Sequence, residues 1–303
     1  MISWQKKHDE LRRVESVCLK MLHEFQQNEI HVSWAMVGLL AQESLQELQT
    51  NFKSRKSPYQ IKNYSPFPLS QDKFTDIPYE IISGLNEAKS ILQTEHQELS
   101  SHTFSHYYTL EEGQDISHFG EDLEDMSIVS EKLNTSFKSI VFPRNQINED
   151  YLKACQEKGI IAFRGNQPNN YWSNSPYSKE SLSKKGMRFL DAYYKVSNTQ
   201  TSKIQDLAEI SGLLNIPASR FFRPHSGKQL LEKRKIKRIK DEMTNAAKTG
   251  CLYHLWWHPH NFSNNTTLHF EQLAVIMEHF KNLKNTYGFK SLNMSEIAEL
   301  PRT

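Results

Sequence analysis

Two spacings of apolar residues alternate along the chain. Between residues 8 and 28, positions such as Val14, Val17 and Met21 recur every three to four residues, as in a helix that buries one face. Residues 31–40, HVSWAMVGLL, form a nearly continuous apolar run that is typical of a buried strand. The same reasoning predicts further strands at 98–102, 139–145, 160–166 and 251–259, and further helices at about 79–93, 116–133, 148–158, 226–248 and 267–286.

This alternation is the pattern of a parallel sheet covered by helices. The number of repeats favours one barrel-like α/β domain spanning 1–303 over a small open sheet. Two stretches rich in polar residues break the alternation, at about 50–78 and about 167–225, and we expect both to be insertions. Because parallel strands place their carboxyl ends on one face, the chemistry is expected at that face.

Composition and charge narrow the range of partners. Lys and Arg together number 37 and Asp and Glu 35, so no excess charge favours nucleic acid or an anionic membrane as a partner. Three widely spaced cysteines without a C-x-x-C pair fit a reducing compartment. No run approaches 18 apolar residues and the amino terminus does not resemble a signal peptide. We therefore expect a cytoplasmic protein without a membrane span.

Polar and basic side chains follow four of the predicted strands. In the first such pair, His102 and His106, residues i and i+4 meet on one face of a helical turn, where two neutral imidazoles can bind one Zn²⁺. The alternative is a pair that caps or packs at the start of a helix. Further histidines at a separate strand end favour chemistry over packing. The residues at the other three ends are Arg144 with Asn145, Arg164 with Asn166, and His258 with His260.

The histidine motif resembles that of a known family. ELSSHTFSH, residues 98–106, resembles the motif of the polysaccharide deacetylases, carbohydrate esterases that include chitooligosaccharide deacetylases. HLWWHPHNF is similar to their late Leu-x-x-His-Pro motif, here Leu255, His258 and Pro259. FPRN stands in the place of their arginine-proline motif, with a different order of residues. The resemblance extends from about residue 11 to 298. SHTFSHYYTLEEGQ, VFPRNQIN and PASRFFRPH are similar to a bacterial branch found with genes for surface polysaccharides.

The resemblance implies a distorted (β/α) barrel of about seven parallel strands and a metal-dependent hydrolase that removes acetyl groups from a carbohydrate. It implies a divalent metal, most simply Zn²⁺, bound by His102 and His106. It also implies His258 as the general acid that protonates the departing sugar amine or alcohol. Arg144 is then expected to orient a catalytic carboxylate or to contact the substrate.

Substrate contacts are expected from residues near these motifs. Tyr107, Trp256 and Trp257 offer stacking faces to a sugar ring, although alternate members of a buried strand must point into the core, so at least one of the tryptophans is expected to pack there. Asn145 and Arg164 offer polar contacts from strand ends. Arg223, in SRFFRPH, fits either a substrate subsite or an ordinary ion-paired loop.

One part of the family pattern is missing. Family members begin with a strand that carries paired acids, one a general base and the other a third metal ligand. Here only MISWQKK precedes the first predicted helix, and Asp9 and Glu10 are better explained as acids at a helix start. We therefore expect an amino-terminally incomplete domain, a barrel open at the missing strand, and little activity. The alternative is a noncatalytic carbohydrate-binding or scaffold protein on the same fold. The sugar, the acetyl linkage and the oligomeric state stay open.

Overall fold

The computed structural model describes residues 8–52, 55–67, 78–167, 169–176, 179–197 and 200–301, so the expectation for MISWQKK lies outside the described residues. Its α-helices are α1 (His8–Arg12), α2 (Val14–Gln27), α3 (Leu45–Phe52), α5 (Tyr79–Ile82), α6 (Leu85–Gln93), α7 (Ile116–Lys132), α8 (Leu152–Glu157), α9 (Leu182–Tyr193), α10 (Gln229–Thr249), α11 (Thr266–Tyr287) and α12 (Met294–Glu299). Its strands are β1 (Val32–Met36), β2 (Gln97–Ser101), β3 (Ser139–Ile140), β4 (Ala162–Gly165), β5 (Glu209–Ile210), β6 (Leu213–Pro217), β7 (Arg220–Phe221) and β8 (Leu255–Trp256).

Six strands form one sheet in the order β1-β2-β3-β4-β6-β5, and β7 pairs with β8 in a second sheet. All pairs are parallel except β5 with β6. The structure therefore confirms an α/β fold with a mostly parallel sheet. A closed barrel of about seven parallel strands is not confirmed, because within the described residues the sheet ends at β1 and β5.

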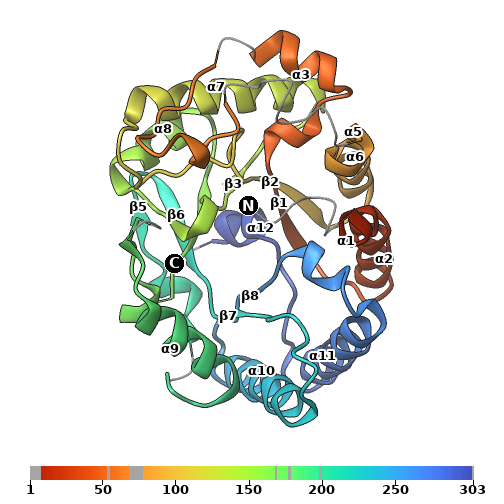
Figure 1. The fold of residues 1–303 in the computed structure, drawn as a ribbon. Coiled ribbons are helices and arrows are strands. Elements are labelled where there is room, and N and C mark those ends of the chain that lie inside the picture. The colour runs from red at the N-terminus through yellow and green to blue at the C-terminus, as the bar shows by residue number, and fades with distance from the viewer. Residues whose placement is uncertain are drawn as a thin grey trace.

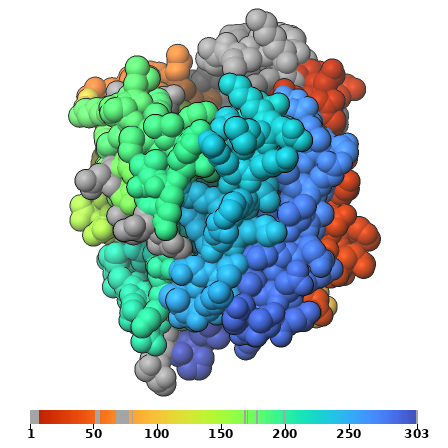
Figure 2. Space-filling view, turned by 90° about the horizontal axis from the view of Figure 1, so that it is seen from below, coloured from red at the N-terminus to blue at the C-terminus, as the bar shows by residue number. Residues whose placement is uncertain are grey.

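Helices surround the strands, and α12 lies inside their ring in the view of Figure 1. The largest apolar cluster joins α2, α10 and α11 to β1 through side chains such as Phe25, Ile239, Phe280 and Trp34. Two smaller clusters lie under α7 and α8 and between α12 and the strands β4 and β6. Figure 2 shows α10 and α11 side by side on one face with the amino-terminal helices beside them. Helices thus pack against the strands through apolar clusters on several sides.

The predicted helices are confirmed where apolar residues recur regularly over a long stretch of sequence. α7, α10 and α11 match the expected ranges to within about three residues. Local signals set their ends, since Asp115 caps α7 by accepting from two backbone N–H groups and Gly250 ends α10 with a φ of 63°. The predicted strand at 31–40 is shorter than expected, because its last three residues belong to a 3₁₀ turn.

The stretch at 167–225 contains α9 and the strands β5, β6 and β7, of which β6 is a full member of the main sheet beside β4. It is therefore more than an excursion from the sheet. In the other expected insertion, about 50–78, residues 50–52 end α3, and residues 55–67 have no strand and one 3₁₀ turn. Residues 53–54 and 68–77 lie outside the described residues. Within the described chain, no helix has both the length and the apolar character that crossing a membrane requires.

Candidate functional site at the carboxyl ends of the strands

His102 directly follows β2 and is fixed there by two hydrogen bonds. Its backbone N–H donates to the Met36 carbonyl at 2.7 Å, and its ring Nδ1 lies 2.6 Å from the Val141 carbonyl oxygen. Because a carbonyl can only accept, the proton of the neutral ring is on Nδ1. The lone pair is then on Nε2. This is the tautomer and support that a metal-binding or proton-accepting histidine needs.

His106 is brought beside His102 by a loop and not by the helical turn that the i, i+4 spacing predicted. Thr103 and His106 have φ values of 63° and 59°, and the two imidazole rings lie 4.9 Å apart at 70°. Asp122 on α7 holds the loop, because its carboxylate accepts from the backbone N–H groups of Phe104 at 2.6 Å and Ser105 at 2.9 Å. Burial raises the pKa of Asp122 to about 6 in spite of these bonds.

A second loop covers the histidine loop from outside. The backbone N–H of Tyr108 donates to the Tyr59 hydroxyl at 2.8 Å, and the Tyr64 and Tyr108 rings meet edge to face at 5.8 Å. The Arg144 guanidinium lies 4.6 Å from the centre of the Tyr108 ring. Arg144 has a φ of 53°, an unfavourable backbone conformation for a non-glycine residue. The structure thus places an exposed arginine beside His106 at a strained position.

Arg164, in β4, is a second cation at this end of the sheet. Its Nη2 donates to the Asn145 side-chain oxygen at 2.7 Å, and its guanidinium lies 4.1 Å from the centre of the Trp256 ring. Burial lowers the pKa of Arg164 to about 9. No ion pair links Arg164 to an Asp or Glu in the part of the chain that the structure describes. Among the described residues, this partly buried positive charge is stabilised by the Asn145 side-chain oxygen and the face of Trp256.

His258 follows β8 and lies among aromatic rings. The centres of the Phe221 and Trp256 rings are each 5.6 Å from that of His258, and His260 stacks on it at 5.1 Å. One side of His258 is exposed, but enough protein surrounds the rest that desolvation lowers its pKa to about 4. His260 and Arg164 add to this shift, and so does His106. His258 therefore lies within electrostatic range of the histidine pair.

The three histidines are unprotonated at neutral pH. Desolvation and His106 hold the pKa of His102 well below its usual range, and desolvation with Arg144 lowers that of His106 to about 4. None of the three, nor Arg164, has a hydrogen bond or ion pair to an Asp or Glu among the described residues. The site therefore offers nitrogen lone pairs in a positive electrostatic environment.

These residues meet only part of the requirement for a catalytic metal. His102 and His106 supply two imidazole nitrogens, whereas catalytic zinc sites use three protein ligands. Within the described residues, three ligand atoms of His, Cys, Asp or Glu come within 4.8 Å of one another only in a different group, His31, His96 and Glu296. The metal site that the sequence implies at the carboxyl ends is thus incomplete in the described chain.

Other expected contact residues lie in different surroundings. Tyr107 is 2% exposed and packs in the core against Phe119, so it offers no face to a sugar. Trp257 packs in the large core cluster against Phe25 and Phe222. Arg223 lies 5.3 Å from the centre of the Phe189 ring. Tyr107 and Trp257 are therefore packing residues in this structure.

The two neighbouring tryptophans of the late motif face opposite sides, as expected for alternate residues of a strand. Trp256 faces Arg164 and His258, whereas Trp257 packs in the core. Asp122, in the helix predicted at about 116–133, was not among the expected site residues. It shares the buried face of α7 with Phe119 and Leu123, and an acid on an apolar face is the signal that could have identified it.

Comparison with known proteins adds evidence on the fold. No family model matches the sequence, and no curated protein matches it. The chain is similar to a crystal structure described as a putative polysaccharide deacetylase from Mycobacterium smegmatis, with 14% identity, a TM-score of 0.54, and coverage of 95% of this chain and 79% of that one. At this identity the similarity shows a common fold. The chain therefore shares its fold with a structure described by the name of the family that its histidine motifs resemble.

Proposed function

We propose that this chain is a hydrolase of the polysaccharide deacetylase type, which removes acetyl groups from a carbohydrate. The observation that carries the proposal is His102, whose Nδ1 proton is fixed on the Val141 carbonyl so that its Nε2 lone pair is available beside His106 and within electrostatic range of His258. The shared fold and the position at the carboxyl ends of parallel strands support it.

His102 and His106 contribute two ligands to a divalent metal ion, with zinc as the first candidate because neutral imidazoles suit it. When bound, such an ion lowers the pKa of a water molecule and polarises a carbonyl group. The low pKa values of the two histidines keep their lone pairs free of protons at neutral pH. The third ligand has to come from outside the described residues or from solvent.

His258 serves as the proton carrier in this scheme. With a pKa of about 4 it is unprotonated at pH 7, so it first accepts the proton of the attacking water. It then gives this proton to the departing sugar amine or alcohol as the bond to the acetyl carbon breaks, and acetate is released. Arg164 and Arg144 place positive charge near the oxygen that becomes negative during the attack.

The sugar lies against aromatic and polar groups at the same end of the sheet. Trp256 and Phe221, whose ring centres are 4.5 Å apart, offer apolar faces, and Trp172 meets Trp256 edge to face at 6.3 Å. Asn145 offers hydrogen-bonding groups, and Arg223 extends the positive charge along Phe221. An acetylated polysaccharide of the bacterial surface, handled in the cytoplasm during its synthesis, is the proposed source of the substrate.

A noncatalytic carbohydrate-binding protein is the second candidate. It is favoured by the lack of any bond between the three histidines and a carboxylate among the described residues. The family resembled uses a carboxylate base and a third protein ligand, and neither lies at this site among the described residues. His258, with a pKa of about 4, is a weak base in place of the carboxylate, and general base assistance contributes about 10² to 10⁴ in rate. Binding of the sugar can therefore remain when turnover does not.

The test measures acetate released from N-acetylated amino-sugar oligomers and from O-acetylated oligosaccharides, with and without added Zn²⁺. We expect slow, metal-dependent turnover that formate increases, because a small carboxylate can replace a missing base. His106→Ala and His258→Ala should abolish it, and His23→Ala, at an exposed histidine on α2, should not. Oligomer binding without acetate release under any condition would favour the second candidate. Neither binding nor release would contradict both.

A further inference from the structure

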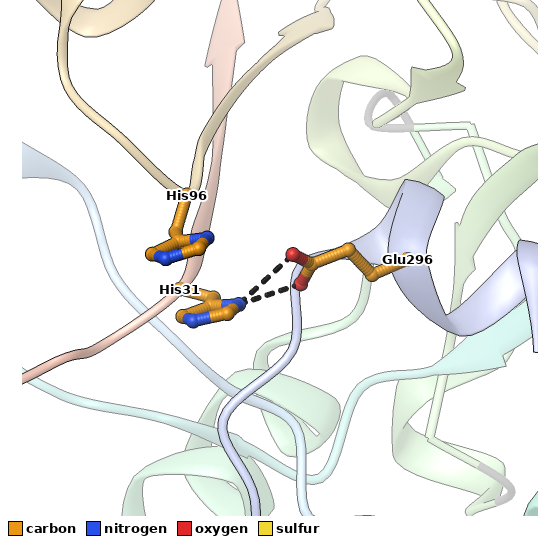
Figure 3. A group of neighbouring side chains, drawn as sticks. All are labelled: His31, His96 and Glu296. Carbon is orange, nitrogen blue, oxygen red and sulfur yellow. Dashed lines mark hydrogen bonds and ion pairs between the residues drawn. The ribbon is translucent and has the colours of Figure 1, made fainter.

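Three potential metal ligands meet at the opposite end of the sheet. His31 precedes β1 and His96 precedes β2, and the parallel register pairs the next residues, Val32 with Gln97. The two histidines are therefore neighbours on adjacent strands, and their rings stack at 4.0 Å and 4°. Glu296, on α12, points its carboxylate at the His31 ring (Figure 3). Residues far apart in the sequence thus converge at the amino ends of the strands.

The ligand atoms of this group are already close to the spacing of a metal site. His31 Nδ1 lies 2.8 Å and 2.9 Å from the two carboxylate oxygens of Glu296. One ligand atom from each of His31, His96 and Glu296 lies within 4.8 Å of the others. Metal–ligand bonds of about 2.0–2.1 Å place tetrahedral ligands about 3.4 Å apart. The two parallel rings have to turn toward a common point before both can bind one ion, and the exposed His96 side chain has room to do so.

Neighbouring groups orient two of the three ligands. The backbone N–H of Asn293 donates to Glu296 Oε2 at 2.8 Å, as part of the capping box that begins α12. The backbone N–H of His31 donates to the Ser291 hydroxyl at 3.0 Å. Such supporting hydrogen bonds fix metal ligands in known sites. The side chains are 18% exposed in His31, 30% in Glu296 and 46% in His96, so an ion can enter from solvent.

The charges around the group favour a cation. Glu95 lies 3.6 Å from His96 Nε2. Glu29, which pairs with Lys284, also lies near enough to interact with His31 and His96. Three carboxylates therefore surround two imidazoles.

We propose that His31, His96 and Glu296 bind one divalent transition-metal ion, with water completing the coordination. Two imidazoles and one carboxylate suit Zn²⁺ and similar borderline ions and do not suit Ca²⁺ or Mg²⁺, which take oxygen ligands. The ion ties α12 to the starts of β1 and β2. It adds to two existing bonds, from the N–H of Met294 to Ser33 at 2.8 Å and from the N–H of Ser295 to Glu98 at 3.2 Å.

The test compares variants that remove a ligand and preserve the backbone. His96→Asn keeps a residue type that tolerates the φ of 64° at this position. Glu296→Gln keeps a side chain that can complete a capping box. Glu299→Gln, an exposed position on the same helix, is the matched control, and His106→Ala removes a ligand at the other end of the sheet. All are made in the full chain with Cys251→Ser, because Cys18 and Cys155 are buried and Cys251 is partly accessible.

Zn²⁺ affinity is measured by competition with a chromophoric chelator, and thermal unfolding is recorded with and without Zn²⁺. We expect one ion whose affinity falls at least tenfold in His96→Asn and in Glu296→Gln but not in Glu299→Gln or His106→Ala. Zn²⁺ should raise the unfolding temperature in every chain except the two ligand variants. Unchanged affinity in both ligand variants, or a loss confined to His106→Ala, would overturn the proposal. So would the absence of measurable Zn²⁺ binding to the unsubstituted site.

Discussion

The two ends of the main sheet differ in how their charged side chains are paired. At the carboxyl ends, His102, His258 and Arg164 have no bond to an acid among the described residues. At the amino ends, Glu98 accepts from the hydroxyls of Ser33 and Ser139 and from the N–H of Ser295. Glu296 bonds His31 and the Asn293 N–H. At the amino ends, Glu98 and Glu296 thus accept hydrogen bonds from several donors. At the carboxyl ends, the basic side chains have no acidic partner among the described residues.

This difference indicates that the amino ends of the strands contribute to stability and the carboxyl ends to chemistry. Buried polar groups that are fully bonded hold elements together, and here they fasten α12 to the strands. Buried bases without acidic partners cost free energy, which is tolerated where a substrate or ion supplies the missing charge or ligand. Among the described residues, the proposed metal site at the amino ends of the strands therefore has three protein ligands, and the one at the carboxyl ends has two.

The largest expected effect is a difference in unfolding free energy between substitutions of two arginines, the buried Arg220 and the partly buried Arg164. Arg220 pairs with Glu242 through two bonds of 2.6 Å, while Arg164 has no acidic partner among the described residues. Arg220→Met leaves Glu242 with fewer counter-charges and should cost about 3–5 kcal/mol of unfolding free energy. Arg164→Met removes an uncompensated charge and should stay within about 1 kcal/mol of the parent chain. Urea unfolding measures both, and a large loss in Arg164→Met alone would reverse the comparison.

The second prediction concerns the support of the histidine loop. Asp122→Ala leaves two buried N–H groups, those of Phe104 and Ser105, without an acceptor and should cost about 3 kcal/mol. Asp122→Asn keeps one acceptor oxygen in the same shape and should cost about half as much. Both are measured by urea unfolding at pH 7.5, where the carboxyl, with a pKa of about 6, is ionised. Equal stability of the two variants would show that the carboxylate does not hold the loop.

The third prediction is a loss of stability in mild acid. His106 has a pKa of about 4 in the folded chain and about 6.5 when unfolded, so the unfolded chain binds more protons between these pH values. Stability should fall as the pH drops from 6.5 to 4, by at most about 1.4 kcal/mol per pH unit for His106, less the part that solvent screening removes. Asp122, whose folded pKa is raised, acts in the opposite direction over part of this range.

The matched variant is His106→Gln, which removes one of the titrating groups and should make the decline shallower. Unfolding free energies at a series of pH values from 7.5 to 4 test this. A decline of the same slope in the variant would mean that His106 does not titrate as described.

Prediction from the sequence succeeded for long helices, in which the spacing of apolar residues repeats over several turns. The spacing of apolar residues identified α2, α7, α10 and α11, because burial of one helix face repeats over several turns. It missed β5, β6 and β7, because they lie in the stretch at 167–225 whose polar residues indicated an insertion. The position of His102 after β2 followed from the strand itself, and its partner His106 was placed beside it on the wrong local structure.

Distant contacts were beyond the reach of the sequence. Which of Trp256 and Trp257 faces the site depends on which side of a two-residue strand each side chain points to. An error of one residue would place the core residue at the site and the site residue in the core. The support of the histidine loop by Asp122 joins residues 17 and 18 positions apart. The group of His31, His96 and Glu296 requires both the register of β1 with β2 and the docking of α12.

The most direct test of the contrast between the two ends is anomalous diffraction at the zinc edge from crystals of the chain soaked in Zn²⁺. We predict the strongest peak between His31, His96 and Glu296, and at His102 and His106 an ion of lower occupancy completed by water. A fully occupied ion at His102 and His106 with a third protein ligand among the described residues, and none at the amino ends, would contradict the account.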